Sequence, residues 1–186
     1  MTSTYFIIHG SFGNPFENWY PWLSKKLSDN GLENIVPQFP IEKNLHTYQN
    51  WSKLLDYYLE LGLINENTTF ICHSIGSIFI IKYLIEKKLK VKKLLFVSGI
   101  NNYVGGFKDL DEVNKSFFCK DIDDIHKYCN DITCFYSDND PYIPLQKLDT
   151  FAQKVADKHL IIKNGGHINT ESGHTEFPEI LKYVLE

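Results

Sequence analysis

The chain has 186 residues, which fits one domain, and 43% of them are hydrophobic, enough to bury a sizeable core without disulfide bonds. Its net charge of −4 gives it no attraction for nucleic acid or for an anionic membrane surface, so we expect neither as a partner. All 19 basic residues are lysines, and the lack of guanidinium groups disfavours a phosphoryl-transfer enzyme that depends on arginine.

The cysteines and the apolar runs favour a cytoplasmic protein. No two cysteines form a C-x-x-C pair, so we expect free thiols, no metal and no cofactor. The first residues show neither the basic segment nor the cleavage site of a secretion signal. The longest apolar stretch, 69–81, is interrupted by His73 and is shorter than the roughly 20 residues of a membrane span.

In chain order, the first half alternates β-branched and aromatic runs with stretches of helical period. Residues 4–9 are almost continuously apolar, which is typical of a buried parallel strand. Apolar side chains then recur at helical spacing from 19 to 27, and Gly31 ends that helix. The next predicted elements are a strand over 35–38, a helix over 51–59 and a strand over 68–72.

The second half continues the same rhythm, apart from an irregular segment over 99–120 with a glycine pair and room for about two helical turns. The predicted strands here are 94–98, 132–136 and 159–162, and the predicted helices are 75–83, 121–129, 145–156 and 177–185. Such alternation predicts an α/β fold with about six parallel strands and helices on both faces. Ligands of such sheets bind beyond the carboxyl ends of the strands.

A serine follows the third predicted strand, in Cys72-His73-Ser74-Ile75-Gly76. In a nucleophile elbow, a strained serine stands between a strand and a helix, and small residues flank it because the two backbones nearly touch. Gly76 fits that need, whereas Cys72 stands where the usual pattern has glycine. Capping of the following helix is the alternative role of Ser74.

An acid and a histidine follow in the order that α/β hydrolases require, serine, then aspartate or glutamate, then histidine. Asp140 comes after the fifth strand and His167 after the sixth, so both lie at carboxyl ends of predicted strands. A turn role for the aspartates and a surface position for the histidine are the alternatives. We predict a catalytic triad of Ser74, Asp140 and His167, with Asp138 as a turn residue. His174, after Gly173, is the alternative base, but it lies further along the loop from the end of the sixth strand than His167 does.

The loop after the first strand, His9-Gly10-Ser11-Phe12-Gly13, can turn a backbone N–H toward the serine. We predict an oxyanion hole made of the N–H groups of Ser11 and Ile75. Aromatic residues on the loops after strands one and five suggest a substrate-binding wall of Phe12, Phe16, Trp19 and Tyr142. The 99–120 segment could add Tyr103, Phe107, Phe117 and Phe118, although the last two could equally belong to the core.

Several segments resemble one family: His9-Gly10, Asn18-Trp19-Tyr20-Pro21-Trp22-Leu23, His73-Ser74-Ile75-Gly76, Asp140-Pro141 with Pro144, and Gly166-His167. They look like the small serine hydrolases related to retinoblastoma-binding protein 9, over almost the whole chain. The resemblance implies an α/β hydrolase without a large lid, with esterase or amidase activity toward small substrates. It also favours Asp140 over Asp138, because the family acid precedes a proline.

Two other readings stay open at this stage. A binding or scaffold protein could keep the hydrolase fold without turnover, and the missing glycine at position 72 is the one feature in its favour. A nucleophilic Cys72 is disfavoured, because a residue two positions before the turn should point into the sheet. The preferred reading is a cytoplasmic serine hydrolase that cleaves small ester or amide substrates.

Overall fold

The computed structural model describes residues 3–185. Six strands form one sheet in the order β2-β1-β3-β4-β5-β6, and every neighbouring pair is parallel. The strands are β1 (Thr4–Ile8), β2 (Glu33–Ile35), β3 (Thr69–His73), β4 (Lys93–Val97), β5 (Ile132–Ser137) and β6 (Lys158–Ile162). The predicted parallel six-stranded sheet is therefore confirmed.

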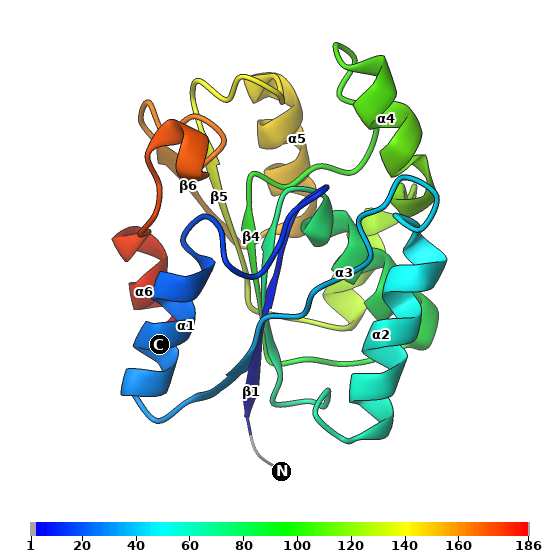
Figure 1. Cartoon of the computed structure of the whole chain (residues 1–186), viewed down its shortest axis with the longest axis vertical. Coiled ribbons are helices and arrows are strands. Elements are labelled where there is room, and N and C mark those ends of the chain that lie inside the picture. Colours follow the sequence, from blue (N-terminus) through cyan, green and yellow to red (C-terminus); the bar gives the residue numbers. More distant parts are fainter. Residues whose placement is uncertain (1–2, 186) are drawn as a thin grey trace.

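Helices cover both faces of the sheet (Figure 1). The α-helices are α1 (Tyr20–Asp29), α2 (Tyr48–Glu60), α3 (Ile75–Lys87), α4 (Lys108–Asn114), α5 (Leu145–Val155) and α6 (Pro178–Leu185). Side chains of α1 and α6 share one buried cluster, and those of α2, α3 and α5 share the other. None of the helices within residues 3–185 is long and apolar enough to cross a membrane.

The alternation of side chains along each strand divides the core between these two layers. In β3, Phe70 and Cys72 belong to the cluster with α2 and α3, whereas Ile71 between them belongs to the cluster with α1 and α6. All five residues of β3 are buried, which explains why apolar residues fill the middle of the strand without alternating with polar ones. The end of β3 is thus held from both sides directly before Ser74.

The second strand corrects one prediction. The strand is Glu33–Ile35, which pairs with Thr4–Phe6, and not 35–38. Pro37 has no N–H to donate, so the ladder ends before it. Glu33 and Asn34 have low strand propensity, so the hydrophobic pattern placed the start of the strand two residues too late.

The irregular segment 99–120 contains α4 and a single 3₁₀ turn, Lys115–Phe117, so no large lid is present. The helix predicted over 121–129 is a 3₁₀ helix, Ile122–Lys127. Its two buried side chains, Ile122 and Ile125, are three residues apart, which matches the period of a 3₁₀ helix better than that of an α-helix.

Candidate active site

Ser74 occupies a sharp turn between β3 and α3. Its backbone has φ 54° and ψ −123°, a conformation that costs free energy for any residue with a Cβ. The turn is fixed by a hydrogen bond from the Ser74 N–H to the Val97 carbonyl (2.8 Å). Although Ser74 stands at the N-cap position, its hydroxyl makes no capping hydrogen bond. The hydroxyl is therefore not used to stabilise the helix.

Two glycines allow other backbone segments to approach this turn closely. A Cβ on Gly76 would lie 2.8 Å from the carbonyl oxygen of His9, so a larger residue would push α3 away from β1. A Cβ on Gly10 would lie 3.1 Å from the Cβ of Ser74. The loop after β1 therefore lies directly against the serine, where an oxyanion hole requires it.

Cys72 replaces the usual glycine without disturbing the turn. Its side chain is fully buried among the residues packed under α2 and α3. Burial raises the pKa of the Cys72 thiol well above its ordinary value, which disfavours the nucleophilic thiolate. Both facts argue against Cys72 as the nucleophile.

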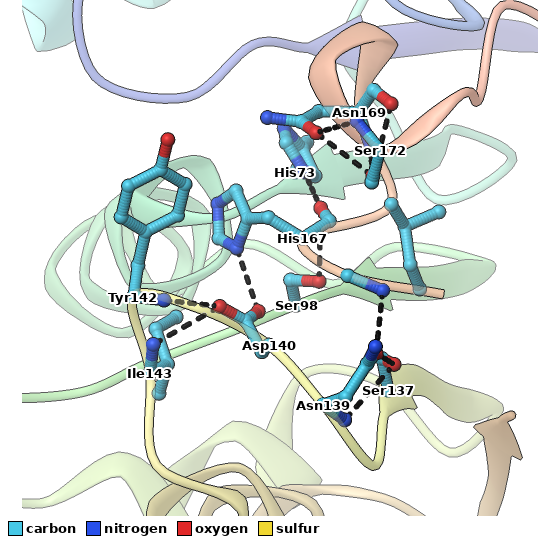
Figure 2. A network of polar contacts seen from close by, with 12 residues as sticks. His73, Ser98, Ser137, Asn139, Asp140, Tyr142, Ile143, His167, Asn169 and Ser172 are labelled. Atoms are coloured by element: carbon cyan, nitrogen blue, oxygen red, sulfur yellow. Dashed lines mark hydrogen bonds and ion pairs between the residues drawn. The ribbon is translucent and has the colours of Figure 1, made fainter. Parts of the chain in front are cut away.

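Asp140 and His167 form a direct pair (Figure 2). The imidazole Nδ1 of His167 lies 2.7 Å from the Oδ2 of Asp140, whose side chain is fully buried. The other carboxylate oxygen accepts hydrogen bonds from the N–H groups of Tyr142 (2.9 Å) and Ile143 (3.0 Å). A carboxylate in this position orients the ring so that Nδ1–H donates to it and Nε2 is left to accept a proton.

A second set of contacts holds the backbone of His167. The sequence did not predict these contacts. The carbonyl oxygen of His167 accepts hydrogen bonds from the Nε2–H of His73 (2.9 Å) and the hydroxyl of Ser98 (3.3 Å) (Figure 2). The hydroxyl of Tyr20 lies 2.8 Å from the other ring nitrogen of His73 and donates to it. Burial lowers the pKa of His73 to about 3, so this imidazole is neutral and donates through one nitrogen only.

The neighbouring candidates, Asp138 and His174, make other contacts. Asp138 accepts a hydrogen bond from the N–H of Asn164 (2.7 Å), and Asn139 accepts one from the N–H of Gly166 (2.8 Å). These bonds tie the loop after β5 to the loop that carries His167. His174 lies instead near Ser172 and against the ring of Phe177.

A cavity of about 860 Å³ opens at the carboxyl ends of the strands. It brings together most of the predicted site residues, namely Ser11, Phe12, Phe16, Ser74, Ile75, Tyr142 and His167. The rings of Tyr142 and His167 are nearly perpendicular, with their centroids 5.1 Å apart. The 99–120 segment contributes Ile100, Val104, Leu110 and Asn114 to the wall.

Trp19 is not part of this wall, which corrects the prediction that it binds substrate. Its side chain is fully buried, packs against Tyr20 and Phe177, and donates a hydrogen bond from Nε1 to the carbonyl of Ile168 (2.9 Å). Trp19 therefore anchors the loop that follows His167. The aromatic residues of the 99–120 segment also lie elsewhere. Phe117 is in the core, Phe118 is partly buried against it, and Tyr103 and Phe107 are exposed outside the cavity lining.

The two residues predicted to supply the oxyanion hole, Ser11 and Ile75, line the same cavity as Ser74. Ile75 begins α3, and the first N–H groups of a helix have no partner within it. Within residues 3–185, no acceptor pairs with the N–H of Ser11 or of Ile75. The loop also contains a left-handed residue, Phe12, with φ 58°. Such local strain is typical of functional loops.

The charges at the cavity are negative. Glu17 and Glu171 line it, and no lysine does so in the described part of the chain. Burial raises the pKa of the Glu17 carboxyl, which accepts hydrogen bonds from Asn14. Glu171 accepts a hydrogen bond from the hydroxyl of Tyr142 (2.6 Å). This lining disfavours anionic ligands.

The parallel sheet, the serine elbow and the aspartate–histidine pair together define the α/β-hydrolase fold. Within that fold class, residues 5–186 match the model of the family described as serine hydrolase, and the chain belongs to this family. It is similar to YdeN of Bacillus subtilis (strain 168), which is named as a hydrolase, with 25% identity over 182 residues, covering 96% of this chain and 92% of YdeN.

Solved structures show the same fold. The crystal structure of the ydeN gene product from B. subtilis has a TM-score of 0.84 at 23% identity, covering 100% of this chain and 97% of that one. A carboxylesterase structure from the archaeon Nitrososphaera gargenis has a TM-score of 0.74 at 12% identity, covering 99% and 89%. Est1E from Butyrivibrio proteoclasticus with bound ferulic acid has a TM-score of 0.70 at 15% identity, covering 99% and 90%. The narrower resemblance to retinoblastoma-binding protein 9 stays a prediction.

Proposed function

We propose that this protein hydrolyses small esters or amides through an acyl-enzyme on Ser74. The observation that carries the proposal is the buried Asp140–His167 pair, 2.7 Å apart, whose imidazole lines the same cavity as the strained Ser74. Membership of the serine hydrolase family supports the hydrolytic reaction. The ester or amide substrate and the covalent intermediate are the finer parts of the proposal.

In the proposed reaction, Nε2 of His167 takes the hydroxyl proton of Ser74 while Oγ forms a bond to the substrate carbonyl carbon. Asp140 holds the ring in place and stabilises its charged form. The N–H groups of Ser11 and Ile75 donate to the oxyanion, each contributing about 3 kcal/mol by comparison with other oxyanion donors. The proton then passes from His167 to the leaving group, and water, activated by the same imidazole, releases the acid.

The cavity favours short, uncharged substrates. Its wall is apolar and aromatic around Phe12, Phe16 and Tyr142, its charges are carboxylates, and α4 has only seven residues with which to cover it. We expect kcat/KM for p-nitrophenyl esters to be highest for short acyl chains and to show no jump above the micelle concentration. A steady rise toward long chains, or activation at an interface, would contradict a small open site.

The pH profile should identify the base. Burial lowers the pKa of His73 to about 3 and that of His9 to about 4, so both imidazoles are already neutral well below pH 6. We therefore expect kcat/KM to rise with pH through one ionisation, because the imidazole of His167 accepts a proton only when it is uncharged.

Two alanine variants separate the candidate bases. His167→Ala should abolish the pH-dependent hydrolysis, whereas His174→Ala should retain most of it, because His174 lies outside the cavity lining. Measurement of kcat/KM across the pH range for both variants checks the assignment. Loss of activity in the His174 variant alone would overturn it.

A further inference from the structure

Asn114, at the end of α4, stands in the wall of the cavity that contains Ser74, and its contacts fix how its amide is turned. One end of the amide lies 2.8 Å from the hydroxyl of Ser11 and 3.0 Å from Nε2 of His46. A hydroxyl donates or accepts equally well, so Ser11 does not decide which end this is. The decision rests on His46.

His46 is 1% exposed, and its other ring nitrogen, Nδ1, is fully buried without a partner. Burial lowers the pKa of His46, so the ring is neutral and carries one N–H. If that N–H were on Nδ1, a buried donor would be left unpaired, which costs more than an unpaired lone pair. The proton is therefore on Nε2, and the amide atom that it meets is the oxygen Oδ1.

The amide nitrogen of Asn114 consequently faces the other way. Among residues 3–185, the fully buried side-chain polar atoms without a partner are Thr4 Oγ1, His46 Nδ1 and Ser52 Oγ. Asn114 Nδ2 is not one of them and makes no hydrogen bond within that part of the chain, so its N–H groups are partly exposed on a residue that lines the cavity. The other residues that the 99–120 segment contributes to this wall, Ile100, Val104 and Leu110, have apolar side chains.

We infer that Asn114 binds substrate, by donating a hydrogen bond from Nδ2 to an uncharged oxygen acceptor beyond the scissile carbonyl, such as an ether, hydroxyl or second carbonyl. This inference rests on the proposed hydrolase function and adds the substrate class. A fixed donor in an apolar wall discriminates against substrates that lack the acceptor, because its N–H then loses water without gaining a partner. Glu17 and Glu171 on the same cavity disfavour an anionic acceptor.

The test compares matched esters that differ by one atom. On the acyl side the pair is p-nitrophenyl methoxyacetate and p-nitrophenyl butyrate, and on the alcohol side it is 2-methoxyethyl acetate and butyl acetate. Asn114→Asp keeps an oxygen for Ser11 and His46 but removes the N–H donors. We expect the ratio of kcat/KM between the oxygen-containing ester and its methylene partner to fall about tenfold in one of the two pairs, the loss of one hydrogen bond.

Because the ratio in each variant is compared with the wild-type ratio for the same two esters, differences in the intrinsic reactivity of the esters cancel. Asn102→Asp, an exposed change of the same kind on the same segment, should leave both ratios at their wild-type values. Asn114→Leu should lower the same ratio as Asn114→Asp, which excludes the added charge as the cause.

The outcomes separate the two levels of the proposal. Equal losses for both members of each pair would overturn the inference, because Asn114 would then only hold Ser11 in place. Unchanged ratios without any loss of activity would overturn it as well, because Asn114 would then have no part in hydrolysis. If the wild-type protein hydrolyses none of the four esters, the proposed esterase function fails, and the inference fails with it.

Discussion

Replacement of Ser74 by alanine should lower kcat by about 10⁴-fold or more while the protein stays folded. The hydroxyl of Ser74 makes no capping bond, so its removal costs the native structure no hydrogen bond. Alanine also has a Cβ, so the strain of the left-handed turn is the same in the variant. The loss should therefore appear in kcat with little change in thermal stability.

Ser77→Ala is the matched control for this change. Ser77 lies about one helical turn further along α3 and is buried outside the cavity lining, and its hydroxyl donates a long hydrogen bond to the Cys72 carbonyl (3.4 Å). Its variant should turn over substrate close to the wild-type rate. Hydrolysis by the Ser74 variant at that same rate would rule out the whole mechanism.

Asp140→Asn should reduce kcat on the order of 10⁴-fold through the tautomer of His167. The asparagine oxygen can still accept from the N–H groups of Tyr142 and Ile143, which leaves its amide NH₂ facing Nδ1 of the imidazole. The imidazole proton is then held on Nε2, where it blocks transfer from Ser74. Circular dichroism and kcat together distinguish this effect from unfolding.

Asp138→Asn is the internal comparison. Its carboxylate accepts one hydrogen bond, from the N–H of Asn164, and an asparagine oxygen can accept the same bond. Turnover should therefore change little. If the two variants behave in the opposite way, Asp138 is the catalytic acid, although the serine and histidine assignments survive.

The sequence predicted the candidate triad because its logic is topological. Parallel strands end at one edge of a sheet, so residues that follow the third, fifth and sixth strands come together whatever the packing of the helices. The strained turn at Ser74 was predictable from the local sequence. A strand that passes directly into a helix, with small residues at the junction, needs a sharp turn.

Residues whose role depends on which way a helix or loop packs were not predictable in the same way. Trp19 shares its helical spacing with core residues, and it is buried against Phe177, near the far end of the chain. His73 and Ser98 act through the backbone carbonyl of His167, which no side-chain pattern records. Asn114 lies in an irregular segment, and only its long-range contacts with Ser11 and His46 distinguish it.

The central claim is that Ser74 is an activated nucleophile, and labelling with a fluorophosphonate tests it most directly. Attack by Oγ forms a serine–phosphorus bond and expels fluoride, so the adduct can be located by mass spectrometry of the digested protein. We predict one adduct, on the peptide that contains Ser74, which is lost in Ser74→Ala and greatly slowed in His167→Ala. An adduct on another residue, or an unlabelled wild-type protein, would contradict the assignment and favour a hydrolase fold that binds without turnover.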